Sequence, residues 1–208
     1  MTRATTRATP GSALAGADAP AGGGADLCAL KIAVVGGFGA GRSTMVRSVS
    51  EIRPLHTEAA MSAATPVSDA GVRVPAKTAT TVALDFGRIT IDEQRVLYLF
   101  GTPGQERFRF LWDRLLRGTT GAVVLVDTRA LTDAWYAIDR LTHHGTPFII
   151  AVNDFGGPFR SEEEIRAVLA LPAGVPLVEF DARDHSSSKF VLIALVEHLR
   201  ALGSGNGV

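Results

Sequence analysis

The amino-acid sequence predicts an α/β fold of three layers, with about six mostly parallel strands between about five helices. Apolar runs of strand length alternate along the chain with segments whose apolar residues recur at helical spacing. Runs that are apolar throughout are typical of a parallel sheet that is covered on both faces. The length of 208 residues suits one domain with a full hydrophobic core.

The strand signals follow one another in a regular order. The first run, LKIAVVGG, ends in glycines, and VALDFGRITI and RVLYLFG are separated only by the short turn Asp92 to Gln94. We expect the latter two to pair antiparallel as a hairpin, because a turn this short brings neighbouring strands side by side. The expected strands are 30–37, 82–91, 95–101, 121–127, 147–153 and 176–182.

Helical spacing marks five segments between and after these strands. The fourth also carries a capping box, in which Ser161 precedes Glu164 by three positions. The apolar positions that define the helices are Met45, Val46, Val49 and Ile52; Phe108, Leu111, Trp112 and Leu115; Ala134, Ile138 and Leu141; Ile165, Val168 and Leu169; and Leu192, Leu195, Val196 and Leu199.

Two segments lack such patterns. Residues 1–27 consist mainly of Ala, Gly, Thr, Pro and Ser, so they offer too little apolar surface to offset the entropy of ordering. We expect a flexible tail here, with a docking role as the alternative, and a single domain over 28–208. Between residues 52 and 81 there is no clean period, and we expect a long loop, which in a compact domain is usually mobile or functional.

Composition excludes several classes of partner. The 21 basic and 21 acidic side chains cancel, so we expect no nucleic-acid surface and no patch for anionic membranes. No apolar run approaches the roughly 18 residues of a membrane span, so we expect no direct membrane insertion. The single cysteine, Cys28, and the absence of an apolar leader predict a cytoplasmic protein.

The stretch VGGFGAGRST, at residues 35–44, has the spacing of a phosphate-binding loop, except that Arg42 stands in place of the usual lysine. It follows a predicted strand and opens a predicted helix. Gly36 and Gly41 let the backbone N–H groups turn inward, and the helix N-terminus adds a positive end that favours phosphate. Taken alone, the motif is equally compatible with a glycine-rich turn that packs helix on strand.

Four further motifs occur in register around this loop. GTPGQERF (101–108) resembles the second switch of Ras-like GTPases, and TVALDFG (81–87) resembles the Rab-like segment that follows the switch threonine. Asn153 ends its strand where the guanine-reading Asn-Lys-x-Asp motif belongs, and DAR (181–183) stands where the loop under the base belongs. Over residues 30–203 the chain therefore resembles a bacterial Ras-like small GTPase with the P-loop NTPase fold.

The resemblance is strongest to the actinobacterial conservon type, which is related to the polarity GTPase of gliding bacteria. The shared stretches are SVSEIRPL, TEAAM, LYLFGTPGQ, GAVVLVDTR and VLIALVEHL. It implies two partners, a roadblock-type regulator and a sensor-kinase-like membrane protein of the same operon, which would recruit this protein to the membrane.

The resemblance also implies GTP and GDP as ligands, Mg²⁺ as cofactor, and roles for individual residues. Gln105 would orient the attacking water, and Ser43 and Thr81 would coordinate Mg²⁺, with Thr78 and Thr80 as competitors for the second position. The residues expected to hold the nucleotide are Gly36, Gly37, Gly39, Gly41, Arg42, Ser43, Thr44, Gly104, Asn153 and Ala182.

Four departures from the family pattern weaken the expected activity. Arg42 keeps the charge of the lysine but is longer and planar. Phe38 places a bulky ring in the loop. Gly101 stands where the Mg²⁺-securing aspartate belongs, and Gly156 where an aspartate would accept two hydrogen bonds from guanine, each worth roughly 1.5–3 kcal/mol. We therefore expect slow hydrolysis and weak guanine specificity.

Three functions remain open from the sequence. The first is a GTP-dependent switch whose segments 51–81 and 101–117 change between states. The second is a pseudoGTPase that keeps the fold as a protein-interaction module, which the coincidence of Arg42, Gly101 and Gly156 favours. The third, a P-loop ATPase that uses Asp127 for Mg²⁺, leaves GTPGQERF unexplained; a metal role for Asp127 or Asp85 is the minor alternative.

Overall fold

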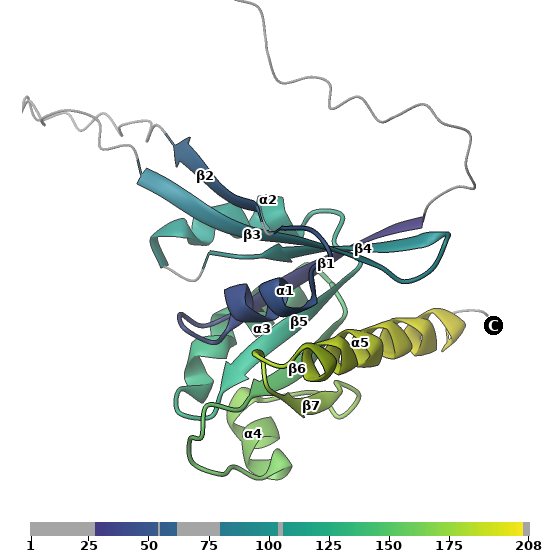
Figure 1. Cartoon of the computed structure of the whole chain (residues 1–208). Helices are drawn as coiled ribbons and strands as arrows, with labels where there is room; N and C mark the ends of the chain where they lie inside the picture. The colour runs from purple at the N-terminus through teal and green to yellow at the C-terminus, as the bar shows by residue number, and fades with distance from the viewer. Residues whose placement is uncertain (1–27, 54, 62–79, 104–105, 206–208) are drawn as a thin grey trace, which may run out of the picture.

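The structure is a computed structural model that describes residues 28–53, 55–61, 80–103 and 106–205. Its centre is one sheet of seven strands in the order β2-β3-β4-β1-β5-β6-β7 (Figure 1). The strands are β1 (Cys28–Gly36), β2 (Leu55–Met61), β3 (Thr80–Thr90), β4 (Arg95–Gly101), β5 (Gly121–Asp127), β6 (Phe148–Asn153) and β7 (Leu177–Phe180).

The directions of the strands determine where a ligand can bind. β1 pairs in parallel with both β4 and β5, and β6 and β7 continue the parallel half, whereas β3 is antiparallel to β2 and to β4. After β1 the chain first forms β2, β3 and β4 on one side of it and then crosses to form β5, β6 and β7 on the other side, so the strand order reverses at β1. In open α/β sheets, ligands bind beyond the carboxyl ends of the strands at such a reversal.

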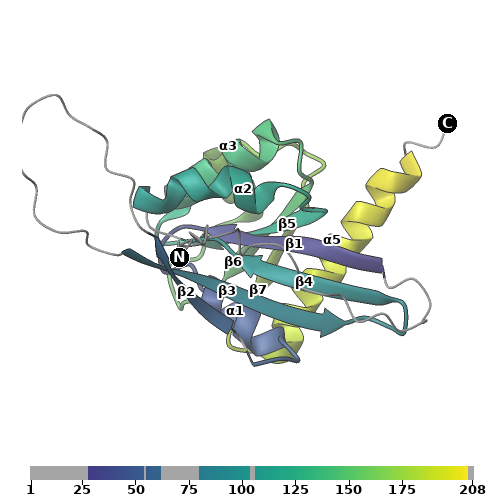
Figure 2. The ribbon, with the colours of Figure 1, turned by 90° about the horizontal axis from the view of Figure 1, so that it is seen from above.

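Helices cover both faces of the sheet. Within the described residues these are α1 (Arg42–Val49), α2 (Trp112–Leu116), α3 (Trp135–His143), α4 (Glu162–Leu169) and α5 (His185–Gly205), with the short 3₁₀ helices η1 (Glu106–Leu111) and η2 (Leu131–Ala134). Figure 2 shows α2 and α3 on one side of the sheet and α1 and α5 on the other. α4 packs on the same face as α2 and α3.

Two hydrophobic clusters fill the spaces between these layers. Ile32 and Val34 of β1 pack with α1 and α5, whereas Ala33 and Val35 pack with α2, α3 and α4. Successive side chains of a strand point to opposite faces, so both faces of β1 are buried. This double burial explains why the central strands are apolar throughout, and it confirms the predicted three-layer α/β fold.

The long loop predicted after residue 52 is wrong for residues 55–61, which form β2. This strand lies at the edge of the sheet and pairs only with β3. Its sequence, LHTEAAM, shows no clean alternation, because an edge strand depends on backbone pairing more than on a buried face. β3 also begins at Thr80, two residues before the expected start. The predicted tail, residues 1–27, lies outside the described residues.

The expected helices are present, but two of them, α2 and α3, are preceded by 3₁₀ turns where α-helix was expected. Residues 106–111 and 131–134 are 3₁₀ helices that continue into α2 and α3. The predicted capping box at α4 is confirmed: Ser161 Oγ accepts from the Glu164 N–H at 3.2 Å, and Glu164 Oε2 accepts from the Ser161 N–H at 3.1 Å. No helix in the described part of the chain combines the length and apolar character that crossing a membrane requires.

Candidate nucleotide site

The glycine loop joins β1 to α1 at the point where the strand order reverses. Gly36, Gly39 and Gly41 have φ angles of 148°, 80° and 99°, in the region that L side chains avoid. A Cβ on Gly36 would lie 2.5 Å from the Leu125 carbonyl oxygen, and one on Gly41 would lie 2.4 Å from Asn153 Nδ2. The loop is thus pressed against β5 and β6, and its curled shape requires glycine.

The loop leads into the N-terminus of α1, where no described side chain caps the free backbone N–H groups. Gly41 is the N-cap residue of α1, no side chain caps it, and the first turn carries no acidic residue. The first N–H groups of a helix have no partner within the helix, and together with the helix dipole they favour an anion. Those of Arg42, Ser43 and Thr44 therefore form the anion-binding end of the loop.

Arg42, the departure from the usual lysine, folds back onto the loop. Its Nη1 donates to the Gly36 carbonyl at 2.5 Å. Burial lowers the pKa of Arg42, and the negative charge of Asp85 opposes that shift. The guanidinium has five N–H donors, so this bond leaves donors that can bind phosphate.

Ser43 contacts Asp85, the carboxylate whose metal role was a minor alternative from the sequence. Its hydroxyl donates to Asp85 Oδ2 at 2.5 Å. Asp85 lies on β3 directly opposite Gly101 of β4, and a Cβ on Gly101 would lie 2.9 Å from that of Asp85. The signal was present in the sequence: continuing the predicted hairpin from Ile91 and Arg95 pairs residue 85 with residue 101.

The second switch is only partly described. Gly104 and Gln105 lie outside the described residues, so their predicted roles stay predictions. Thr81 is four residues before Asp85 on β3, which at 3.3 Å per residue places it about 13 Å away along the strand. Its side chain lies outside the described part of the structure, so its predicted role in binding Mg²⁺ stays a prediction.

Asn153 connects the phosphate loop with the loop predicted to lie under the base. Its Nδ2 donates to the Ala40 carbonyl at 3.1 Å, and its Oδ1 accepts from the Ala182 N–H at 2.9 Å. Both Asn153 and Ala182 are buried. Three motifs that are far apart in the sequence, at residues 36–44, 153 and 182, thus meet at one point.

Gly156, which stands where the family pattern has the aspartate that binds guanine, lies in an open turn. Gly156 has a φ of 65°, and its N–H donates to Asp154 Oδ1 at 2.7 Å. The Asp154 carboxylate therefore caps its own turn. Among the described residues, nothing lies within 4 Å of a Cβ placed on Gly156. No described side chain occupies the space that a side chain at residue 156 would enter.

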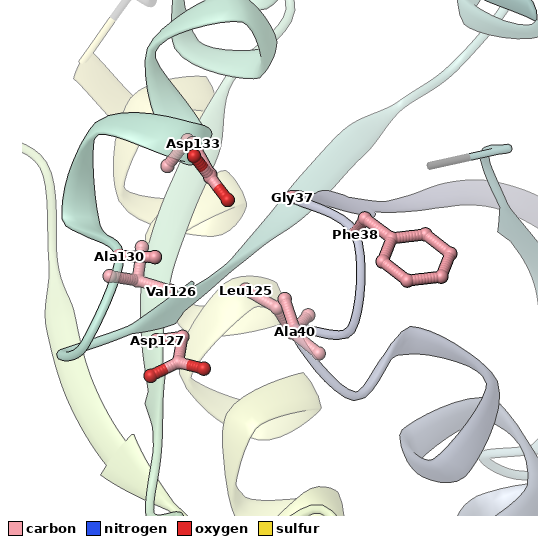
Figure 3. A pocket seen from close by; sticks show the side chains of 9 residues that line it. Gly37, Phe38, Ala40, Leu125, Val126, Asp127, Ala130 and Asp133 are labelled. Carbon is pink, nitrogen blue, oxygen red and sulfur yellow. The ribbon is translucent and has the colours of Figure 1, made fainter. Parts of the chain in front are cut away.

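A small cavity behind the loop brings two further acidic residues close to it (Figure 3). Asp133 points toward Gly37, whereas the Phe38 ring extends out of the loop and is 75% exposed. Asp127 accepts from Arg129 Nε at 2.9 Å and Nη2 at 2.6 Å, and the hydrogen bond from Arg129 lowers the pKa of Asp127. This carboxylate already has a cationic partner, which argues against the ATPase alternative that used it for Mg²⁺.

The glycine loop, the open helix end and the asparagine bridge define a P-loop nucleotide-binding protein. The chain matches, over residues 34–201, a family model described as a conserved hypothetical ATP-binding protein, and it belongs to that family. The crystal structure of the G domain of the T. maritima FeoB iron transporter aligns with a TM-score of 0.59 and 15% identity, covering 82% of this chain and 99% of that one. That likeness shows the fold, which is that of a GTPase domain.

One curated relative matches a shorter stretch. An uncharacterized protein of Methanocaldococcus jannaschii is 45% identical over 47 residues, which is 23% of this chain and 30% of that protein. The family and the fold agree on a nucleotide-binding P-loop protein, and the family description names ATP.

Proposed function

We propose that this protein is a nucleotide-dependent switch of the small-GTPase type in bacterial signalling, which binds GTP with Mg²⁺ and discriminates weakly against ATP. The observation that carries the proposal is the Asn153 bridge. A buried amide that joins the phosphate loop at Ala40 to the base loop at Ala182 holds both halves of a nucleotide site in one arrangement. A loop that merely packed helix on strand would not require this link.

The phosphate half has the chemistry that a triphosphate needs. The N–H groups of the loop and of the first turn of α1 would bind phosphate oxygens, and Arg42 would add charge-assisted bonds. Ser43 offers a hydroxyl oxygen to Mg²⁺, a cation that prefers oxygen ligands and neutralises phosphate charge. Hydrolysis is expected to be slow, because Arg42 already donates to Gly36 and Phe38 projects from the loop.

The base half supports weak selectivity. Gly156 offers no carboxylate, Asp154 caps its own turn, and the Ala182 N–H is already donated to Asn153. The protein would therefore lack the two carboxylate oxygens that accept hydrogen bonds from guanine and not from adenine. Membership in a family described as ATP-binding agrees with this expectation.

A second candidate is a protein-interaction module with little nucleotide turnover. It is favoured by the hydrogen bonds that two of the phosphate-loop side chains already make within the protein: Arg42 donates to the Gly36 carbonyl, and Ser43 donates to Asp85 of β3. In either case the proposed partners are a roadblock-type regulator and a sensor-kinase-like protein, since both follow from the resemblance of the whole chain.

Titration of the purified full chain with fluorescent GTP, GDP and ATP analogues, with Mg²⁺ or with EDTA, separates the candidates. We expect micromolar binding of GTP and ATP, with affinities that differ by less than about tenfold, or 1.4 kcal/mol. No binding up to millimolar nucleotide, restored by Arg42→Lys combined with Gly156→Asp, would instead support the interaction module.

A further inference from the structure

We propose that Asp85 supplies, from the neighbouring strand, the carboxylate that secures Mg²⁺ beside Ser43, in place of the side chain that Gly101 lacks. The inference rests on the proposed function, because Mg²⁺ is expected to arrive with a nucleotide. It gives Asp85, whose metal role was only a minor alternative from the sequence, a defined place in the site, and it removes one of the departures that suggested a decayed site.

The strand register places the two residues together. Asp85 and Gly101 are direct partners in the antiparallel pair of β3 and β4, so their side-chain positions lie on the same face of the sheet. A Cβ on Gly101 would lie 2.9 Å from Asp85 Cβ and 3.1 Å from Asp85 Oδ2. The Asp85 side chain therefore occupies the space that a side chain at residue 101 would enter.

Close packing of β3 against α1 brings this carboxylate to the phosphate loop. Gly87 shares the face of Asp85, and a Cβ there would lie 2.9 Å from Val46 Cγ1 of α1. Because Gly87 has no side chain, the helix approaches the strand closely, and Ser43 in its first turn reaches Asp85 at 2.5 Å. The serine that we expect to bind Mg²⁺ and this carboxylate thus present adjacent oxygens.

This pair of oxygens fits the way P-loop proteins hold Mg²⁺. The cation usually takes one or two carboxylates, the phosphates of the ligand and several waters, and the protein part of a P-loop site is a Ser or Thr hydroxyl and one aspartate. The described residues contain no cluster of three or more His, Cys, Asp or Glu side chains that could hold a metal without help. A site of one hydroxyl and one carboxylate therefore depends on the nucleotide.

A competing role for Asp85 is to balance the charge of Arg42, whose pKa it raises against the effect of burial. The two roles predict different effects of removing the charge on the gain in nucleotide affinity that Mg²⁺ gives. Without a cation, a carboxylate near the phosphates repels them in either role, so its loss does not weaken binding in EDTA. If the carboxylate binds the metal, its loss also reduces the gain from Mg²⁺, whereas the gain stays intact if it only faces Arg42.

The test uses Asp85→Asn, which keeps the shape and an oxygen acceptor for Ser43, and Asp127→Asn as the control, since that carboxylate is paired with Arg129. Affinity for fluorescent GDP and GTP is measured with Mg²⁺ and with EDTA. We expect Asp85→Asn to reduce the gain from Mg²⁺ by about tenfold or more, the range seen when a group that supports a bound metal is removed, and not to weaken the affinity measured in EDTA. Asp127→Asn should behave like the wild type.

Two further measurements make the assignment specific. Mn²⁺ serves as a paramagnetic probe: its affinity for the GDP complex, followed by electron paramagnetic resonance, should fall in Asp85→Asn and not in Asp127→Asn. The double variant Asp85→Gly with Gly101→Asp moves the carboxylate across the strand pair, where the lost side chain leaves room, and should restore the dependence on Mg²⁺.

Each outcome has one consequence. A wild-type chain that binds no nucleotide, with or without Mg²⁺, overturns the proposed function and this assignment with it. If the wild-type chain binds nucleotide more tightly with Mg²⁺, and Asp85→Asn shows the same gain in affinity, the assignment alone is overturned. Tighter binding of Asp85→Asn in EDTA with the full gain from Mg²⁺ retained overturns it in favour of the Arg42 counter-charge.

Discussion

Gly101 and Gly156 both stand where the family pattern has an aspartate, but their surroundings differ. Gly101 lies in a paired strand, and the Asp85 carboxylate fills the space beside it. Gly156 lies in an exposed turn with open space around its Cβ position. A side chain lost from a sheet can be replaced by its cross-strand neighbour, whereas one lost from a turn has no neighbour to replace it.

This contrast divides the site into two halves. The phosphate half, formed by the loop, the start of α1 and Asp85, keeps the groups that a triphosphate and a divalent cation need. The base half keeps its scaffold, the Asn153 bridge, and lacks the group that would read guanine. Departures from a motif therefore predict loss of function only after the neighbouring residues have been considered.

The largest effect is expected from Gly41→Ala, which should break the link between the two halves. The new Cβ would lie 2.4 Å from Asn153 Nδ2, on a backbone with φ of 99°. Left-handed backbone costs about 1–2 kcal/mol, and overpacking adds about 1–3 kcal/mol. We expect a clear fall in the urea midpoint and loss of nucleotide binding.

The matched control is Gly39→Ala in the same loop. Its φ of 80° carries the same backbone cost, but among the described residues nothing lies within 4 Å of the new Cβ. Gly39→Ala should thus lose only about 1–2 kcal/mol of unfolding free energy. Equal destabilisation by the two variants would mean that the packing against Asn153 is unimportant.

A comparable loss of stability is expected from Asn153→Ala, which removes the bridge and leaves the loop glycines unchanged. The Ala40 carbonyl and the Ala182 N–H would lose their hydrogen bonds to Asn153 in a buried region, at about 1–3 kcal/mol for each group that stays unsatisfied. GTP and ATP affinities should fall together, because both loops lose their relative position.

Asp154→Ala is the control for this variant, since Asp154 is exposed and its side chain accepts a hydrogen bond from Gly156 of its own turn. Its unfolding free energy should change by less than about 1 kcal/mol. If Asn153→Ala binds both triphosphates as the wild type does, the bridge does not organise a nucleotide site, and the main support for the proposed function is lost.

Most of the fold could be predicted because the buried strands carry their own signal. Strands such as β5 and β6 are apolar on both faces, and their boundaries could be placed to within a residue. β2 could not be predicted, because an edge strand with one partner needs no apolar pattern. The 3₁₀ turns before α2 and α3 were missed for a related reason: their apolar residues also fit α-helical spacing.

The site was predictable where a motif is local in the sequence. The glycine loop, Asn153 and Ala182 could be found from their order and position, and the structure brings them together. The contact of Ser43 with Asp85 depends on the pairing of β3 with β4 and on the close packing that Gly87 permits. Such a contact follows from strand register, which motif matching does not use.

The smallest change, and the sharpest test of the base half, is Gly156→Asp. The turn has room for the side chain, and its φ of 65° is a region that Asp tolerates better than most residues. Charge-assisted hydrogen bonds to guanine are worth about 1.5–3 kcal/mol each, and exposure to solvent reduces this value. We therefore expect the ratio of GTP to ATP affinity to rise by about tenfold, measured by parallel titrations.

Gly156→Asn has the same backbone and a similar shape but cannot accept both guanine hydrogen bonds through a carboxylate. It should leave the ratio of GTP to ATP affinity within about threefold of the wild type. Since 1.4 kcal/mol corresponds to tenfold, threefold is about 0.7 kcal/mol, less than one charge-assisted hydrogen bond. If the two variants shift the ratio equally, the turn at residue 156 does not face the base. The weak selectivity would then have to arise from the Ala182 N–H, which Asn153 already occupies, and the contrast between the two glycines would no longer explain it.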